Sequence, residues 1–272
     1  MAEMCARLFS FVIAIVTAVV TLSACSKAPT SPSVSVQPVP IGEITQTSVP
    51  APPRSDVGVP NAIGLTRYLA FGDSITWGAS SGWDPRFTFA AAPGAYPERL
   101  LVGLNTYHSP QQFTMFNEGQ PGEWVTNALD RFKILLTQHR PQAVLLLEGF
   151  NDLNNHVSIA NTITGIKRLL DAAAVAGVPV LVATMYQTYE VVDPLGVVRW
   201  NAATEIEDFN VEVRKLPMGR LNVYVVDLYP LLNDRDLIGN DGVHTTDEGN
   251  IIMATAFLDA IESAFPVRGN IQ

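Results

Sequence analysis

The chain has 272 residues, of which 47% are hydrophobic and 16% are charged, and its formal net charge is −9 at pH 7. This composition supports one globular domain with a sizeable core and excludes a mainly disordered chain. Lysine and arginine form no basic stripe along the sequence, so we expect no nucleic-acid partner.

The N-terminal residues are typical of an export signal, because Arg7 precedes an apolar stretch over residues 8–20. This stretch is shorter than the roughly 20 apolar residues that span a bilayer comfortably. It ends in Leu22-Ser23-Ala24-Cys25, which resembles the bacterial lipobox, the signal at which a cysteine is lipidated. We predict a signal peptide over residues 1–24 and a lipid anchor on Cys25 that holds the protein at the bacterial cell envelope. An ordinary cleaved signal peptide and an uncleaved anchor helix are the alternatives.

Proline, serine, threonine and valine dominate residues 25–61. Such a stretch buries too little apolar surface to offset its ordering entropy, so we predict an extended tether between the membrane and a catalytic domain over residues 62–272. Cys5, the only cysteine besides Cys25, lies in the predicted signal peptide. The mature domain therefore has neither a disulfide nor a cysteine metal site.

After the tether, short apolar runs alternate with amphipathic segments, the pattern of an α/β fold with a parallel sheet. The apolar runs predict buried strands over residues 67–71, 113–116, 143–147, 179–183 and 223–226. The amphipathic segments predict helices over residues 96–104, 124–139, 159–176, 202–216 and 246–264. We expect a three-layer α/β/α sandwich around a five-stranded parallel sheet, with ligands at the carboxyl ends of the strands.

Ser74 follows the first predicted strand in the turn Gly72-Asp73-Ser74. A serine is a poor nucleophile at its ordinary pKa and needs an adjacent base. His244 is the candidate base, because Asp241 lies three residues before it in a glycine-containing loop and can hold the imidazole in the required tautomer. These three residues predict a serine hydrolase.

Four sequence blocks in order resemble those of the SGNH or GDSL hydrolase superfamily. They begin with Gly72-Asp73-Ser74, where Ile75 replaces the leucine that gives the motif its name. The next two are residues 117–122, Asn-Glu-Gly-Gln-Pro-Gly, and Gly149-Phe150-Asn151-Asp152. The last is Asp241-Gly242-Val243-His244. The resemblance covers residues 66–264 and implies the flavodoxin-like SGNH hydrolase fold.

The resemblance also implies roles for single residues. Ser74, Asp241 and His244 would be catalytic, and the Ser74 N–H, the Gly122 N–H and the Asn151 amide would form the oxyanion hole. Such donors, aimed at the charge that develops on oxygen, are often the largest catalytic contribution. Asp73 and Asn117 would support the surrounding loops, with no metal and no other cofactor. Taken singly, Gly122 would only permit a turn and Asn151 would only cap a helix.

The resemblance leaves the substrate open. Lipid esters, as for a lysophospholipase, and short-chain or acetyl esters both suit an envelope esterase, and a polysaccharide O-acetyl esterase or an acyltransferase is the alternative. A glycan- or lipid-binding module without turnover is the alternative from another class. Aromatic side chains in two predicted loops suit an acyl groove, a sugar platform or simple packing; they are Trp77, Trp83, Phe87, Phe89, Tyr189 and Trp200.

Overall fold

The computed structural model describes residues 49–53, 62–79, 94–192, 195–200 and 204–267. The predicted signal peptide, Cys25 and nearly all of the predicted tether lie outside these residues. Within the described part of the chain, no helix is long and apolar enough to cross a membrane.

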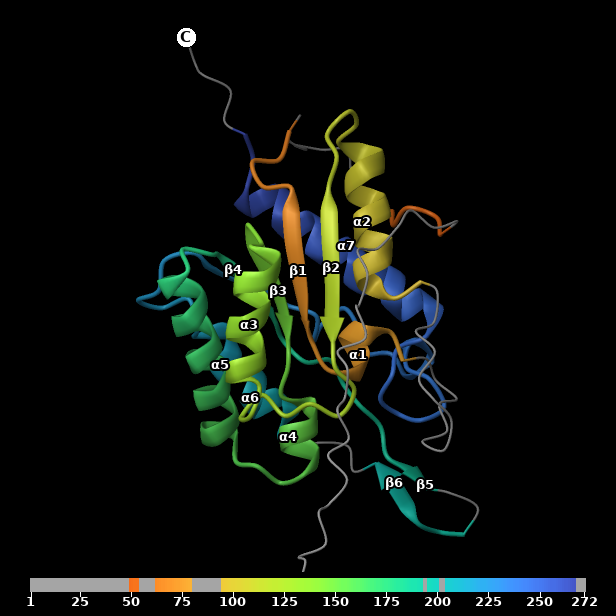
Figure 1. Ribbon diagram of the computed structural model, residues 1–272. Helices are drawn as coiled ribbons and strands as arrows, with labels where there is room; N and C mark the ends of the chain where they lie inside the picture. The colour runs from red at the N-terminus through yellow and green to blue at the C-terminus, as the bar shows by residue number, and fades with distance from the viewer. Residues whose placement is uncertain (1–48, 54–61, 80–93, 193–194, 201–203, 268–272) are drawn as a thin grey trace, which may run out of the picture. The chain divides into compact units, whose positions relative to one another are not determined.

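A five-stranded sheet forms the centre of the domain, and its neighbouring strands are parallel (Figure 1). The strands are β1 (Arg67–Gly72), β2 (Thr114–Gly119), β3 (Ala143–Leu147), β4 (Val180–Ala183) and β7 (Val223–Val226). Their spatial order is β2-β1-β3-β4-β7. All five predicted strands are confirmed, which sets their carboxyl ends along one edge of the sheet.

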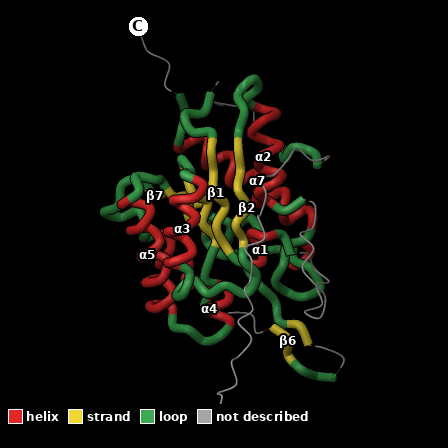
Figure 2. The backbone as a smooth tube through the Cα atoms, in the orientation of Figure 1, coloured by secondary structure: helices red, strands yellow, loops and turns green. Residues whose placement is uncertain are grey.

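Helices cover both faces of the sheet, so the predicted three-layer sandwich is confirmed (Figures 1 and 2). On one face α2 (Tyr96–Tyr107) packs against α7 (Asp247–Ala264). The other face carries α3 (Leu129–His139), α5 (Ile159–Val175) and α6 (Ile206–Arg214). The long helices α5 and α7 begin with side-chain caps, since Ser158 accepts from Asn161 N–H and Thr246 accepts from Gly249 N–H.

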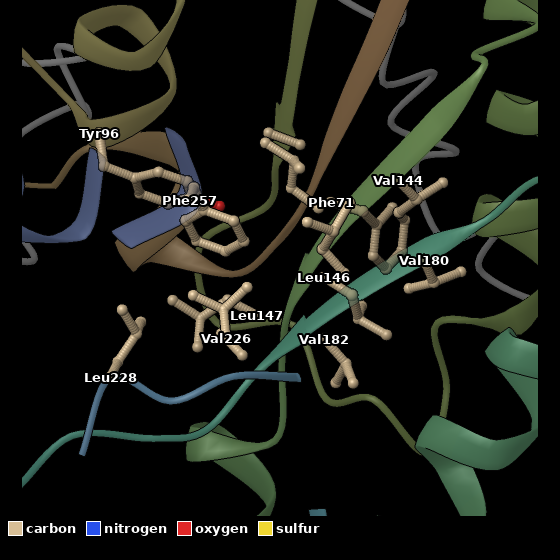
Figure 3. Close-up of a cluster of buried hydrophobic side chains, with 14 of the residues drawn as sticks. Phe71, Tyr96, Val144, Leu146, Leu147, Val180, Val182, Val226, Leu228 and Phe257 are labelled. Atoms are coloured by element: carbon tan, nitrogen blue, oxygen red, sulfur yellow. The ribbon is translucent and has the colours of Figure 1, made fainter. Parts of the chain in front are cut away.

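The hydrophobic core lies on both faces of the sheet (Figure 3). Tyr96 of α2 stacks on Phe257 of α7 with ring centroids 5.1 Å apart. On the opposite face Phe71 meets Phe132 of α3 edge to face at 4.9 Å. The strands supply apolar side chains to both faces, and β3 is buried along its whole length. This packing fixes the strand ends on which the candidate site is built.

Two predicted helices begin later than the sequence suggested, and one of them, expected from residue 202, is α6, which begins at Ile206. We expected the other helix from residue 124, whereas α3 begins at Leu129. Residues 125–128 form turns, in which the Asn127 N–H donates to the Trp124 carbonyl at 2.9 Å and the Ala128 N–H donates to the Val125 carbonyl at 3.3 Å. The Asp152 carboxylate holds these turns by accepting the backbone N–H groups of Val125 at 2.7 Å and Thr126 at 3.2 Å.

Five short elements were not predicted. Two are single helical turns at the carboxyl edge, α1 (Ser74–Trp77) and α4 (Phe150–Asn154). The others are η1 (Arg235–Leu237) and a two-stranded antiparallel pair of β5 (Val191–Val192) and β6 (Val198–Trp200). Each is too short for its periodicity to stand out in the sequence.

Candidate active site

Ser74 is the first residue of α1, directly beyond the carboxyl end of β1. Asp73 caps this helical turn, because its Oδ1 accepts the Ile75 N–H at 2.9 Å. The Asp73 and Ile75 side chains are buried, whereas Ser74 is partly exposed. The turn therefore presents the serine hydroxyl at the edge of the sheet while its neighbours anchor it.

The loop that carries Asp241 and His244 requires a glycine between them. Gly242 has a φ of +79°, and a Cβ at this position would lie 2.0 Å from the Tyr189 carbonyl oxygen. The same contact holds the loop, since Tyr189 N–H donates to the Gly242 carbonyl at 2.7 Å. Asp241 Oδ1 then accepts the backbone N–H groups of Val243 and His244, each at 3.0 Å. Any side chain at residue 242 would disrupt this loop.

Ser74, His244 and Asp241 form a continuous chain of hydrogen bonds. His244 Nε2 lies 2.8 Å from Ser74 Oγ, and His244 Nδ1 lies 2.8 Å from Asp241 Oδ2. A carboxylate only accepts, so His244 Nδ1 donates its proton to Asp241 and leaves Nε2 to accept the serine proton. The histidine is 2% exposed, which shields both bonds from water. Ser74 and His244 are 170 positions apart in the chain, and the fold brings them together.

A sequence model of the GDSL-like lipase/acylhydrolase family matches residues 70–251, a segment that includes all four motif blocks. The chain belongs to this family. It is thus an acylhydrolase, an enzyme that hydrolyses ester bonds. No curated protein sequence matches the chain significantly.

Solved structures share the fold of this acylhydrolase. Acetylxylan esterase Axe2 from Geobacillus stearothermophilus is 20% identical with a TM-score of 0.57, over 73% of this chain and 95% of that one. A Clostridium thermocellum family 3 carbohydrate esterase is 21% identical with a TM-score of 0.52, over 72% and 94% of the two chains. Esterase EstA from Pseudoalteromonas sp. is 18% identical with a TM-score of 0.54, over 72% and 96%. At these identities the likeness concerns the fold.

The three predicted oxyanion donors differ in their present partners. Within the described residues, the N–H groups of Ser74 and Gly122 donate no hydrogen bond. The Asn151 amide is already engaged, because its Nδ2 donates to the Glu123 carbonyl at 3.0 Å and to Asp73 Oδ2 at 3.1 Å. An oxyanion would compete with the Asp73 carboxylate for one of these N–H groups.

The two predicted supporting residues both brace the strand ends of the acylhydrolase. Asn117 joins β2 to α1, since its Nδ2 donates to the Thr76 carbonyl at 2.9 Å and its Oδ1 accepts the Gly119 N–H at 3.0 Å. Asp73 does more than form a turn, because one of its oxygens caps α1 and the other accepts from Asn151. It therefore links the serine to a predicted oxyanion donor.

Two carboxyl groups at the site have shifted pKa values of opposite sign. Burial raises the pKa of Asp73 from 3.8 to about 6, although the Ile75 N–H and the nearby His244 counteract it. Burial also acts to raise the pKa of Asp241, but hydrogen bonds from the His244 side chain and two backbone N–H groups outweigh it and hold that pKa below its usual value. Asp241 is thus held as the carboxylate that the imidazole requires.

A group of charged residues next to the predicted oxyanion donors was not foreseen from the sequence. Glu148 directly follows β3, Glu123 directly follows Gly122, and both are buried. Arg131 of α3 contacts Glu123 through Nε at 2.7 Å and through Nη2. The available signal was a glutamate placed directly after an uninterrupted apolar strand, where a solvated charge is not expected.

A groove opens beside Gly122. Its lining combines an aromatic ring, two primary amides and a charged pair, from Gln120, Gly122, Glu123, Trp124, Asn127 and Arg131. Trp77 and Tyr189, two of the predicted loop aromatics, lie in described segments. Trp83, Phe87 and Phe89 lie outside the described residues, as does Cys25. In the described segments, no group of three or more His, Cys, Asp or Glu side chains is suited to hold a metal ion.

Proposed function

We propose that this acylhydrolase is a serine esterase that cleaves carboxylic esters through an acyl-serine intermediate. The observation that carries the proposal is the pair of 2.8 Å hydrogen bonds, one from His244 Nδ1 to Asp241 Oδ2 and one from Ser74 Oγ to His244 Nε2. A nucleophile, a base and an orienting carboxylate in this arrangement are the parts that activated-serine chemistry needs.

In the first half-reaction, Ser74 Oγ attacks the ester carbonyl carbon as His244 Nε2 takes the hydroxyl proton. The carbonyl oxygen becomes an oxyanion, which the free N–H groups of Ser74 and Gly122 stabilise together with the Asn151 amide. His244 then returns the proton to the alcohol oxygen as the carbon–oxygen bond breaks. The alcohol leaves, and the acyl group remains on Ser74.

In the second half-reaction a water molecule replaces the alcohol. His244 removes its proton, the hydroxide attacks the acyl-serine, and the proton passes to Ser74 Oγ as the acid leaves. Asp241 stabilises the imidazolium that forms in both half-reactions, and it stays ionised because its hydrogen bonds hold its pKa low.

The proposed substrate is an ester with a short acyl group, acetate above all. Support comes from proteins of the same fold, which include an acetyl esterase and an acetyl xylan esterase. Lipid esters of the lysophospholipid type remain the competing class, since the predicted lipid anchor would bring the enzyme to a membrane surface.

The groove beside Gly122 favours a second candidate, a polysaccharide O-acetyl esterase. Trp124 offers a ring face for a sugar, and Gln120 and Asn127 offer amides for its hydroxyl groups. Arg131 is paired with Glu123, so its charge is compensated and an anionic headgroup has less to gain there. A neutral glycan suits this lining better than a phosphate.

Hydrolysis of p-nitrophenyl esters from acetate to palmitate tests the proposal, with Ser74→Ala as the matched control. We expect the highest kcat/KM on acetate, and a loss on the order of 10⁴-fold or more in the alanine variant. A rate that rises with chain length would favour a lipid ester. Release of acetate from acetylated xylan, compared with p-nitrophenyl acetate, tests the glycan candidate.

A catalytically idle binding module would give a different result. The wild type would then hydrolyse no ester at a rate above Ser74→Ala, while both proteins bound the same glycan or lipid. Hydrolysis that Ser74→Ala leaves intact would also contradict the proposal, because the chemistry would not pass through the serine.

The proposed location is the bacterial cell envelope, with Cys25 as the lipidated anchor. Leu22-Ser23-Ala24-Cys25 supports this proposal. Metabolic labelling with a fatty acid in a bacterial host should label the wild type, and Cys25→Ser should abolish both the label and membrane fractionation. Equal labelling of the two proteins would contradict the anchor.

A further inference from the structure

Three buried carboxyl groups lie near the predicted nucleophile, and one cation, Arg131, contacts one of them. Asp73, Glu123 and Glu148 are 1%, 8% and 3% exposed. Asp73 and Glu123 both raise the pKa of Glu148, and Glu123 also raises the pKa of Asp73. Arg131 contacts this cluster through its two hydrogen bonds to Glu123. Three buried negative charges against one positive charge are strongly unfavourable, so the cluster needs a proton.

The hydrogen bonds indicate which carboxyl group holds this proton. Glu123 accepts two charged N–H groups from Arg131, and Asp73 accepts the Ile75 N–H at 2.9 Å and the Asn151 amide at 3.1 Å. Glu148 accepts the Gly149 N–H alone, at 3.3 Å, and its Oε1 is buried without a partner among the described residues. The Glu148 carboxylate would be the least stabilised of the three.

Glu148 also has an acceptor for such a proton, because its carboxyl group lies within hydrogen-bonding reach of the Glu123 carboxyl. Two carboxylates can only accept, so this contact is attractive only when one of them is protonated. Glu123 is the carboxyl group that is paired with Arg131. A proton held by this cluster would therefore be most favourable on Glu148, from which it can be donated to Glu123.

We propose that Glu148 is a neutral carboxylic acid at neutral pH and acts as a positioning residue for the oxyanion donor Asn151. The Asn151 amide is held by Glu123 O at 3.0 Å and by Asp73 Oδ2 at 3.1 Å. A negative charge on Glu148 would repel both residues that supply these acceptors. A neutral Glu148 keeps them in place. This kinetic role rests on the proposed function, whereas the protonation state does not.

The groups that face Glu148 come from several parts of the fold, and Tyr186, which follows β4, lines the same cavity as Glu148 and Asp73. The others are Asp73 from the β1–α1 turn, Glu123 from the β2–α3 loop and Arg131 from α3, and Tyr96 of α2 also lies within electrostatic range. Burial raises the pKa of Glu148 well above its usual value, Asp73 and Glu123 raise it further, and Arg131 lowers it. His244 and Asp152 act on Asp73 and reach the cluster through it.

Infrared difference spectroscopy on the folded full chain tests the protonation state directly. The spectrum of the wild type minus Glu148→Gln at neutral pH should show the carbonyl stretch of a protonated carboxylic acid. Glu262→Gln is the matched control, since Glu262 is also buried but pairs with His108, through Glu262 Oε1 and His108 Nε2 at 2.8 Å. That difference should show a carboxylate band. A carboxylate band for Glu148 would overturn the proposal.

Kinetics on p-nitrophenyl acetate test the positioning role. Glu148→Gln keeps a donor for Glu123, so its kcat should stay within about threefold of the wild type. Glu148→Ala removes the donor, and its kcat should fall roughly tenfold to a hundredfold with a smaller change in KM. The wild type should lose kcat on the alkaline side as Glu148 ionises, and Glu148→Gln should lack this loss.

Two kinetic results would overturn the positioning role. One is a Glu148→Gln variant as impaired as Glu148→Ala, which would mean that the carboxylate itself is needed. The other is the same alkaline loss in wild type and Glu148→Gln. If Glu148→Ala does not fold, the pH profile of Glu148→Gln still tests the positioning role. If no protein hydrolyses any ester, the proposed function fails while the infrared result still tests the proton.

Discussion

The two edges of the sheet, one formed by the amino ends of its strands and the other by their carboxyl ends, differ in how their polar groups are paired. At the amino edge, neutral amides tie the chain together: Gln111 Oε1 accepts the Ile63 N–H at 2.8 Å, and Gln111 Nε2 donates to the Ile63 carbonyl at 2.9 Å. At the carboxyl edge, Asp73 and Glu148 are buried carboxyl groups with raised pKa values. The amino edge pairs its buried carboxyl group, Glu262, with His108 at 2.8 Å, whereas Asp73 and Glu148 at the carboxyl edge form no ion pair with the described residues.

This difference indicates which edge contributes mainly to stability and which contributes mainly to catalysis. A neutral amide pair can be lost at the cost of two hydrogen bonds. A buried carboxyl group is unfavourable to folding unless it is paired, and such groups cluster at sites that do chemistry. Substitutions at the carboxyl edge should therefore change kcat far more than stability, and substitutions at the amino edge should do the reverse.

Asp241→Asn should give the largest effect in this comparison. The amide oxygen can still accept the backbone N–H groups of Val243 and His244, so the loop should fold as before. The amide NH₂ would face His244 Nδ1 and favour the wrong tautomer of the imidazole. We expect kcat to fall about 10³- to 10⁴-fold with a melting temperature near that of the wild type. A loss below tenfold would remove Asp241 from the catalytic group.

Asn151→Ala should rank second. It deletes a proposed oxyanion donor, and we expect kcat to fall about 10²- to 10³-fold. The matched control is Asn155→Ala, because Asn155 caps the same helical turn and its Nδ2 donates to the Asn151 carbonyl at 2.7 Å. The control should keep kcat. Equal losses in the two variants would attribute the effect to the helix and not to the donor.

Asp73→Asn should lower kcat about tenfold to a hundredfold. The asparagine oxygen can cap Ile75, but its NH₂ would then face the Asn151 amide, and two donors cannot bond each other. Asn151 should therefore shift. The ratio of kcat in Asp73→Asn and wild type, measured on acetate esters at pH 8, checks this step. An unchanged kcat would show that Asp73 does not position Asn151.

The same variant should change the pH dependence of stability. The folded pKa of Asp73 is about 6 and its ordinary value is 3.8, so the native state binds more protons than the unfolded state between these values. Stability then falls as the pH rises from about 4 to about 6, by on the order of 1–3 kcal/mol. Asp73→Asn should lack this decline in urea unfolding curves. An identical slope in both proteins would contradict the raised pKa.

Most of the fold could be predicted from the sequence because hydrophobic periodicity carries it. The five strands are short apolar runs between amphipathic segments, and each was found within a few residues of its observed bounds. The late start of α3 could not be foreseen. The turns that precede it are held by the Asp152 carboxylate, which comes from another segment and reaches Val125 and Thr126 only in the folded chain.

The candidate site could be predicted only where its residues lie in motifs. The sequence predicted that Ser74 and His244, 170 positions apart, act together because each lies in a recognisable glycine-containing block. Glu148 and Arg131 carry no such motif. Their roles depend on how many charges the fold buries together and which donors each carboxyl group finds, and neither quantity can be read from residue order.

Gln111→Ala should give the smallest effect on activity and a clear effect on stability. It removes both hydrogen bonds to the buried Ile63, and we expect a loss of about 1–3 kcal/mol in urea unfolding with kcat unchanged on acetate esters. Gln112→Ala is the control, since Gln112 is exposed. It should change neither quantity. A fall in kcat for Gln111→Ala in the fully folded protein would mean that the two edges are coupled, and the separation of stability from chemistry would fail.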